Sequence, residues 1–309
     1  MKIAVVGIGG VGGYYGGRLA KHYHLDGNTE IVFIARGGQL TAIRNQGLRL
    51  LHAGGEFTVQ PDMATDVPEG AIFDMVLFCV KSYSLANSAR MLAGSIGANT
   101  TVVSLLNGVD NAARLREVLQ DAVVLNGCVY LSAHVAGPGL VRQVGGSGQL
   151  FFGSPATTGY DAGKIEALLR AAGIDAAHTG DIEKVVWEKF LFIAPLAGAT
   201  AYTERTVGEV VNDPESRSLL EALLDELLAV ADALGLKFAD TIRQDTLRKA
   251  RGFPPQTKTS LQLDFEKGSR TELETFTGFT VREAHRLGIP APLHEKVYSR
   301  LRAKEMPTG

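Results

Sequence analysis

Residues 2–12 read Lys-Ile-Ala-Val-Val-Gly-Ile-Gly-Gly-Val-Gly, an apolar run that leads directly into the pattern Gly7-x-Gly9-x-x-Gly12. Between a strand and a helix, this pattern is typical of the phosphate-binding turn of a dinucleotide-binding fold. Gly7 would permit the tight turn, Gly9 would let the backbone approach a pyrophosphate, and Gly12 would let the helix pack closely on the sheet. We expect the unpaired N–H groups and the positive dipole end of that helix to bind the phosphates.

The residues around the motif support this interpretation. Residues 2–6 are rich in β-formers, residues 14–21 can form a helix, and residues 31–34 are a second apolar run at the spacing of a βαβ unit. The alternative explanation is a glycine-rich surface loop, which the flanking strand and helix patterns disfavour.

The end of the second predicted strand bears on the choice of cofactor. Residues 35–38 read Ala-Arg-Gly-Gly, without the Asp or Glu that an NAD site usually places there for the ribose 2′-hydroxyl. A guanidinium such as that of Arg36 can bind a 2′-phosphate through a fork of hydrogen bonds. The sequence therefore favours NADP(H) over NAD(H), and a solvated loop charge is the alternative explanation for Arg36.

Composition limits the other classes. The chain has 309 residues, of which 45% are hydrophobic and 21% charged, which suits one large or two medium globular domains. Its net charge of −2 gives no indication of a nucleic-acid or membrane partner. Cys79 and Cys128 lie in apolar runs and are predicted to be buried reduced thiols. We find no signal-peptide pattern, no run of membrane-spanning length and no metal-ligand spacing, so we expect a cytoplasmic protein without a metal.

The pattern of elements changes near residue 180. Before it, apolar runs predict strands at 75–80, 101–106, 123–125, 128–131 and within 140–152, then a helix at 162–172 and a strand near 174–178. From Asp181 onward the periodicity is helical, with segments at 182–197, 219–234 and within 257–287. We therefore predict an α/β protein with an N-terminal Rossmann-like dinucleotide-binding domain (1–180) and a C-terminal all-helical domain (181–309). We expect the helical domain to close the ligand crevice and to carry the substrate side.

Two polar residues follow central strands of the first domain. Lys81 comes after the run at 75–80, and Asn107 after the run at 101–106. In a doubly wound sheet, ligands bind beyond the carboxyl ends of the strands, so both residues are candidates for the cofactor edge. Ordinary turn chemistry is the alternative, since Asn-Gly is itself a turn signal.

The helical half offers further candidates. Lys189 lies within an apolar stretch, where a partly buried amine could transfer a proton, although a stem on apolar surface with its amine in water is the commoner arrangement. Glu226 lies at the edge of a buried stripe and could pair with such a lysine or merely border the core. Glu272 reads most simply as a helix-capping residue, because Ser269-x-x-Glu272 and Thr271-x-x-Glu274 both fit a capping box.

Taken together, these motifs resemble those of the ketopantoate reductase (2-dehydropantoate 2-reductase) family over nearly the whole chain. The resemblance includes the glycine turn, Lys81, Asn107-Gly108, Trp187-x-Lys189, the block Ser260-Leu-Gln-x-Asp264-x-x-x-Gly268-x-x-Thr271-Glu272, Gly278 and Gly288-Ile-Pro-x-Pro292. It implies that NADPH passes a hydride to the keto carbon of ketopantoate, giving D-pantoate for pantothenate and coenzyme A synthesis.

The resemblance also implies roles for single residues and replaces several of the simpler explanations. Lys189 would be the general acid, with Glu226 as its structural partner. Substrate would be bound by Asn107, Ser260 and Glu272. The cofactor would be bound by Gly7, Gly9, Gly12, Arg36, Lys81, Asn107 and Glu272, with Arg36 at the 2′-phosphate. A homodimer is compatible with the family, although the sequence shows no interface.

One departure from the family pattern concerns the substrate. The family commonly has Asn one turn and again two turns after the lysine, where this chain has Ile193 and Ala197, and Pro195 could kink the helix between them. A more apolar wall discriminates less well for a polar substrate group. The alternatives are therefore a reductase of another branched or bulky 2-keto acid and a non-catalytic NADP(H)-binding regulator.

Overall fold

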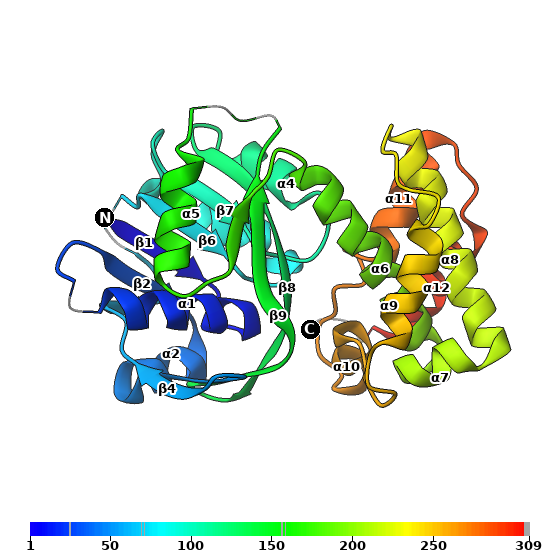
Figure 1. The fold of residues 1–309 in the computed structure, drawn as a ribbon, viewed down its shortest axis with the longest axis horizontal. Helices are drawn as coiled ribbons and strands as arrows, with labels where there is room; N and C mark the ends of the chain where they lie inside the picture. The colour runs from blue at the N-terminus through cyan, green and yellow to red at the C-terminus, as the bar shows by residue number, and fades with distance from the viewer. Residues whose placement is uncertain (25, 69, 71, 156, 158, 306–309) are drawn as a thin grey trace. The chain divides into compact units, whose positions relative to one another are not determined.

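The computed structural model describes residues 1–305 with the exception of 25, 69, 71, 156 and 158. The chain forms two compact units, Met1–Val186 and Trp187–Gly309. Figure 1 shows the first unit in blue to green and the second in green to red.

The first unit is built on a single sheet. Within the described residues, ten strands form it in the order β4-β3-β9-β8-β7-β6-β1-β2-β5, with β10 beside β9. The strands are β1 Lys2–Val6, β2 Glu30–Ile34, β3 Leu48–His52, β4 Gly55–Val59, β5 Met63–Thr65, β6 Met75–Phe78, β7 Thr101–Ser104, β8 Val123–Gly137, β9 Leu140–Gly153 and β10 Ala176–His178. The run β8-β7-β6-β1-β2-β5 is parallel, whereas β3–β4 and β8–β9 pair antiparallel.

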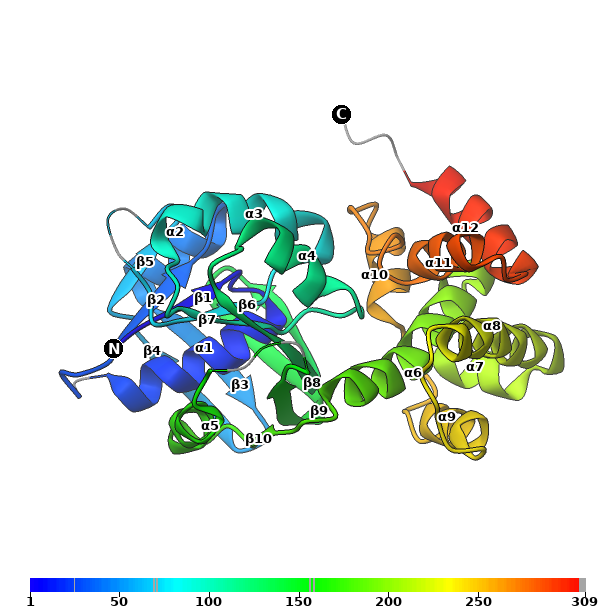
Figure 2. The same cartoon turned by 90° about the horizontal axis from the view of Figure 1, so that it is seen from above.

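Helices cover both faces of this sheet. They are α1 Gly10–Tyr23, α2 Gly37–Gln46, η1 Ser82–Ser84, α3 Leu85–Leu92, η2 Ala93–Ser95, α4 Asn111–Val118 and α5 Ala162–Ala171. Alternate residues of β1 face opposite sides, so Ile3 and Val5 join the core with α1 and α5, whereas Ala4 and Val6 join the core with α3 and α4. Figure 2 shows the two pairs of helices on opposite sides of the strands. This two-sided burial explains why the central strands are continuously apolar.

Some strand limits differ from the sequence prediction. The apolar runs at 123–125 and 128–131 belong to one strand, β8, which continues through Gly127. A Cβ on Gly127 would lie 2.6 Å from the Ser104 carbonyl oxygen, so close approach to β7 requires glycine there. The strands β3, β4 and β5 and the helix α2 were not predicted.

The second unit is helical. Its helices are α6 Ile182–Thr203, which begins in the first unit, then α7 Val207–Asn212, α8 Pro214–Ala233, α9 Ile242–Arg251, α10 Ser260–Glu266, α11 Thr277–Leu287 and α12 Pro292–Lys304. No strand occurs in the part of this unit that the structure describes. The first turn of α6 packs on the sheet of the first unit, because Ile182 and Val186 form an apolar cluster with Cys128. The two compact units divide within α6, between Val186 and Trp187.

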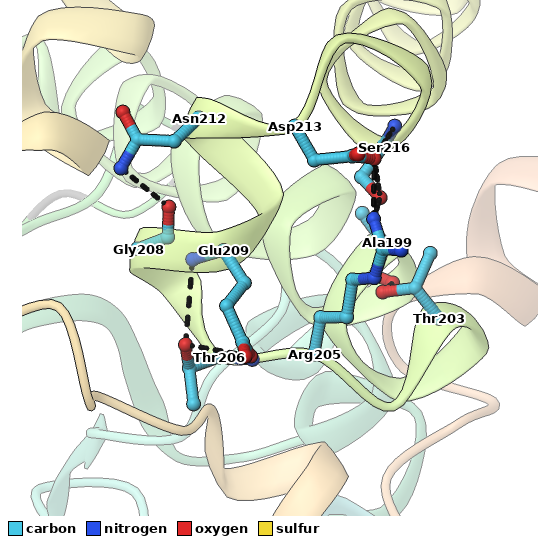
Figure 3. Close-up of polar contacts among 9 residues, drawn as sticks. All are labelled: Ala199, Thr203, Arg205, Thr206, Gly208, Glu209, Asn212, Asp213 and Ser216. Atoms are coloured by element: carbon cyan, nitrogen blue, oxygen red, sulfur yellow. Dashed lines mark hydrogen bonds and ion pairs between the residues drawn. The ribbon is translucent and has the colours of Figure 1, made fainter.

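Between α6 and α8 the chain makes two turns, and at each turn a side chain caps the start of the next helix, α7 or α8 (Figure 3). Thr206 and Glu209 form a capping box at the start of α7, in which Glu209 accepts from the Thr206 N–H at 2.7 Å. Asp213 caps α8 by accepting from the Ser216 N–H at 2.9 Å, and Arg205 pairs with the same carboxylate. These caps satisfy N–H groups that a helix start leaves unpaired.

Candidate active site

The surroundings of the three motif glycines differ, so a side chain would be excluded at two of the positions and accommodated at the third. Gly7 has φ +90°, and a Cβ there would lie 2.7 Å from Val80 Cγ1. A Cβ on Gly12 would lie 2.0 Å from the Gly7 carbonyl oxygen, so this position sets the close packing of α1. A Cβ on Gly9, by contrast, would meet nothing within 4 Å. Gly7 and Gly12 therefore serve the fold, whereas Gly9 borders open space.

The start of α1 suits a bound pyrophosphate. Gly9 is the N-cap residue and provides no side-chain cap, and the first turn of this 14-residue helix carries no acidic side chain. The N–H groups of the first turn thus have no capping oxygen from the N-cap residue and no carboxylate within the same turn of the helix. The residues present therefore fit the diphosphate of a dinucleotide.

A fourth glycine of the turn was missed by the sequence analysis. A Cβ on Gly10 would lie 2.0 Å from the carbonyl oxygen of Ala133, in β8. The Gly-Gly pair at 9–10 is the signal that could have indicated it, since the motif itself requires only the first of the two.

Strand register brings Lys81 and Asn107 to the same edge of the sheet as the glycine turn. The paired residues at the carboxyl ends of β2, β1, β6 and β7 are Ile34, Val6, Phe78 and Ser104, and Ser104 pairs with Asn126 inside the longer strand β8. Lys81 and Asn107 each follow this row by three residues and are half-buried. Lys81 is the N-cap residue of η1, and Asn107 precedes Gly108, whose φ is +108°. Two neighbouring strands therefore carry an amine and an amide at corresponding positions.

Arg36 follows the same row by two residues, at the end of β2. It is exposed, it is the N-cap residue of α2, and its Nη2 donates to the thioether sulfur of Met91 at 3.3 Å. A thioether is a weak acceptor, and no carboxylate in the described part of the chain pairs with this guanidinium. Added Cβ atoms on Gly37 and Gly38 would meet nothing within 4 Å. The backbone that follows Arg36 therefore borders open space, and no carboxylate of the described residues competes for the guanidinium.

In the second unit, α6 carries Lys189. The helix continues through Pro195 to Thr203 as one element. Lys189, Ile193, Ala197 and Thr200 share one face, because helical residues at offsets of four and of about eleven nearly align. Lys189 and Ile193 are half-buried, while Ala197 and Thr200 are buried. Along this face, an amine on Lys189 is followed by two apolar side chains and then by the hydroxyl of Thr200.

Aromatic packing connects Lys189 with Glu272. The ring of Phe190 stacks on Phe276 at 6.4 Å between centroids and meets Phe279 edge-on at 5.5 Å. The Phe276 N–H donates to the Glu272 carbonyl at 3.2 Å. Glu272 is only 4% exposed, so its carboxylate is held in a buried setting. The segment that carries Glu272 therefore packs on the turn of α6 that carries Lys189.

A hydrogen bond between two hydroxyl groups connects α6 with Thr259, the residue before Ser260. Ser260 is the first residue of α10 and is exposed, and Thr259 is its N-cap residue. The Thr200 hydroxyl donates to the Leu196 carbonyl at 2.9 Å and therefore accepts from the Thr259 hydroxyl, 2.7 Å away. Thr200 was not recognised in the sequence, because its partner lies 59 residues further along the chain.

The predicted capping boxes at Glu272 and Glu274 are wrong. The next helix, α11, begins at Thr277 with Phe276 as its N-cap residue and has no side-chain cap. Glu274 instead accepts from the Tyr298 hydroxyl at 2.6 Å and pairs with Arg282 at 2.7 Å.

The expectation that Glu226 is the structural partner of Lys189 is also wrong. The Glu226 carboxylate, on α8, accepts from the N–H groups of Leu293 and His294 at 2.8 and 2.9 Å and meets His294 Nδ1 at 2.8 Å. Burial raises the pKa of Glu226, but the hydrogen bonds from His294 and Leu293 outweigh it and hold the pKa below its ordinary value. Glu226 therefore caps the N-terminus of α12.

The part of the chain that the structure describes contains no cluster of three or more His, Cys, Asp or Glu side chains suited to a metal ion. None of its helices combines the length and the apolar character needed to cross a membrane.

Comparison with known proteins places the chain in a family. Residues 3–157 match the family model described as ketopantoate reductase PanE/ApbA, and residues 181–305 match the model of its C-terminal domain. The chain belongs to the ketopantoate reductase family, whose members are oxidoreductases that depend on a pyridine nucleotide. The predicted resemblance and the predicted fold class, a Rossmann-like domain followed by a helical one, are thereby confirmed.

Individual relatives match over almost their full length. The chain is 30% identical over 308 residues to an uncharacterized oxidoreductase, YkpB, of Bacillus subtilis, covering 99% of each. It is 30% identical to a 2-dehydropantoate 2-reductase of Halobacterium salinarum, covering 94% of this chain and 95% of the relative. Among solved structures, a PanE/ApbA family ketopantoate reductase from Ralstonia eutropha matches with TM-score 0.89 and 31% identity, covering 99% of this chain and 98% of the other. A 2-dehydropantoate 2-reductase from Porphyromonas gingivalis matches with TM-score 0.84 and 36% identity, covering 98% and 99%.

Proposed function

We propose that this protein reduces 2-dehydropantoate to D-pantoate with NADPH, a step of pantothenate and coenzyme A biosynthesis. The observation that carries the proposal is the strand register of the first unit. It brings the glycine turn, Lys81 and Asn107 to one sheet edge, with Arg36 and no acid at the end of β2. The 2-dehydropantoate 2-reductases among the relatives support the choice of substrate.

Residues of the first unit would hold the cofactor, which supplies a hydride when it is bound. Gly9 and the start of α1 would bind the pyrophosphate, while Lys81 and Asn107 would bind beyond the ends of β6 and β7. Arg36 would bind the 2′-phosphate, because a guanidinium pairs with phosphate through two parallel hydrogen bonds. An acid at the same place would repel that phosphate.

Residues of the second unit would serve the substrate. The carbonyl oxygen of a 2-keto acid gains negative charge as it is reduced, so a cationic proton donor beside it lowers the barrier. Lys189 would supply both the charge and the proton. Glu272 would accept a hydrogen bond from the substrate hydroxyl and would also contact the cofactor, and Ser260 would donate to the substrate carboxylate. In this proposal residues 1–180 form the nucleotide domain and residues 181–309 the substrate domain.

The test is NADPH oxidation, followed by absorbance, with ketopantoate beside a panel of other 2-keto acids and with NADH as the cofactor control. Efficient turnover of ketopantoate with NADPH, and poor turnover with NADH, is the expected result. Nucleotide binding without turnover of any 2-keto acid would instead favour a regulator, and preference for NADH would remove the role given to Arg36.

A second candidate is the reduction of another branched or bulky 2-keto acid. The observation that favours it is the apolar middle of the α6 face, where Ile193 is half-buried and Ala197 is 3% exposed. Neither side chain can pair with a substrate hydroxyl. Preference for 2-keto acids that lack the 4-hydroxyl, combined with a shift toward ketopantoate in Ile193→Asn, would support this candidate over the first.

A further inference from the structure

We infer that Asn111 and Arg114, on one face of α4, are positioning residues that set the spacing between the loops carrying Lys81 and Asn107. The inference rests on the proposed function, because those two loops form the proposed cofactor edge. Residues three apart on a helix are neighbours on its surface, so the two side chains can act together.

Asn111 holds the loop after β7. Its amide nitrogen donates to the backbone carbonyl of Asn107 at 2.9 Å. That carbonyl belongs to the peptide that precedes Gly108, whose φ of +108° turns the chain sharply. Fixing this peptide fixes the direction in which the Asn107 side chain leaves the backbone. Asn111 therefore acts on Asn107 through its backbone.

Asn111 is buried although one of its polar atoms has no hydrogen-bond partner among the described residues. It is 3% exposed, and its Oδ1 has no hydrogen-bond partner among the described residues. A buried acceptor without a partner costs stability, and an apolar side chain of similar shape would avoid that cost. The presence of an amide at this position is therefore best explained by the hydrogen bond that its nitrogen donates to the Asn107 carbonyl.

Arg114 holds the loop after β6. Its Nη2 donates to the carbonyl of Ser82, the residue after Lys81, at 3.1 Å. Its Nη1 lies 3.8 Å from Asp110 Oδ1, one turn earlier on the same helix, which orients the guanidinium. A single helix thus hydrogen-bonds to the Asn107 carbonyl in one loop and to the carbonyl of Ser82, the first residue of η1, next to Lys81 at the end of the other.

The position of α4 explains why these loops need such a connection. Strands β6 and β7 stay in register as far as Phe78 and Ser104, and the Leu105 N–H donates to the Phe78 carbonyl at 2.8 Å. Lys81 and Asn107 lie beyond this paired region. Side chains from a rigid element can position a loop where the strand ladder has ended.

The same helix provides a matched control. Arg116 also donates to a backbone carbonyl, that of Val124 at 2.9 Å, and to the Ser154 hydroxyl at 3.1 Å. Val124 pairs with Val102, two residues before the end of β7, so this contact lies within the ladder and away from the loops. Replacing Arg116 removes an equivalent hydrogen bond without touching the proposed edge.

The experiment compares Asn111→Leu, Arg114→Met and the control Arg116→Met with the unaltered protein. The dissociation constant of NADPH is measured by titration of nucleotide fluorescence without substrate, and the thermal midpoint of each variant is recorded. We expect NADPH to bind about five- to tenfold more weakly to Asn111→Leu and Arg114→Met, roughly the value of one hydrogen bond. The dissociation constant of NADPH for Arg116→Met should stay within about twofold of that of the unaltered protein, even if the thermal midpoint of this variant falls further than those of the other two.

The outcomes separate positioning from stability. Weaker binding in Asn111→Leu without a matching fall of the midpoint supports positioning, since this variant also removes the unpartnered oxygen. Arg114 is about a third exposed, so Arg114→Met decides the question if Asn111→Leu does not fold. Binding within twofold in the folded variants would overturn the inference and leave the proposed function intact. If the unaltered protein binds no nicotinamide nucleotide, both fall together.

Discussion

Glu226→Gln should strongly destabilise the helical unit. The carboxylate accepts two backbone N–H groups at the start of α12 and meets His294 Nδ1, and the side chain of His294 is only 2% exposed. Glutamine keeps one acceptor oxygen but turns an NH₂ group toward the remaining donors. With its oxygen in the place of Oε2, glutamine loses the contact with the Leu293 N–H, and its two contacts with His294 are no longer charge-assisted. One lost hydrogen bond at about 1.5–3 kcal/mol and two weakened ones give an expected loss of about 3 kcal/mol.

The effect should depend on pH in a defined direction. Since the folded pKa of Glu226 lies below its ordinary value of 4.5, the carboxylate stabilises the folded state above that pH. This contribution is lost as the pH falls through the folded pKa. The difference in free energy of unfolding between the unaltered protein and Glu226→Gln should therefore reach its maximum at pH 7 and decrease below about pH 4.5.

A built-in probe makes the measurement specific. Trp187 is the only tryptophan of the chain, is 4% exposed, and packs edge-on against Phe190 and Phe279 in the second unit. Its fluorescence during urea unfolding therefore reports on the helical unit. With a slope of about 2 kcal/mol per M, the expected loss moves the midpoint by about 1.5 M.

The matched control is Glu295→Gln. Glu295 forms a 2.7 Å contact with His285, but both side chains are largely exposed, so its loss should cost under about 1 kcal/mol. Equal midpoints for the two variants at pH 7 would refute the assignment of Glu226 as the cap of α12. A difference that persists undiminished at pH 3.5 would refute the argument from its pKa.

Other variants test the proposed site. Lys189→Ala should lower turnover of the preferred 2-keto acid by roughly two to four orders of magnitude, the usual effect of removing a positioned acid, and activity within a few-fold would contradict the mechanism. Arg36→Ala should weaken NADPH much more than NADH in parallel titrations, and equal losses would exclude Arg36 from phosphate recognition. Gly9→Ala should fold normally and bind NADPH more weakly, whereas Gly10→Ala should lower the thermal midpoint, since its Cβ would lie 2.0 Å from the Ala133 carbonyl oxygen. A normal midpoint in Gly10→Ala would show that α1 can shift.

Local patterns predicted much of this fold. The first strand was predicted at its observed limits, Lys2–Val6, because an apolar run ending in a glycine turn leaves few alternatives. The helical second half followed from periodicity alone. Short or polar elements were missed, such as α9, Ile242–Arg251, in which only Thr246 and Ala250 are buried. Such a helix has too narrow an apolar face to stand out in a sequence.

The errors at the candidate site share a physical cause. Capping boxes were predicted at Glu272 and Glu274 because their spacing is local, but local spacing does not show where the helix begins. The partner of Glu226 is His294, 68 residues away, and a pairing at such a distance leaves no periodic signal. Asn111 escaped notice because its significance lies in a backbone contact. Strand ends could be predicted, whereas the side chains that hold their loops could not.

The α6 face separates the chemistry of the proposed reaction from its selectivity. Reduction of any 2-keto acid needs a cation and a proton near the carbonyl oxygen, and Lys189 can supply both whatever follows it on the helix. Ile193 and Ala197 offer no hydrogen-bond partner, and burying an unpaired substrate hydroxyl beside them costs about 1–3 kcal/mol, roughly tenfold or more in kcat/KM. An apolar substituent at the same place bears no such cost. In the proposed mechanism, the class of reaction would follow from Lys189, and the choice among 2-keto acids would depend on the two apolar side chains that come after it.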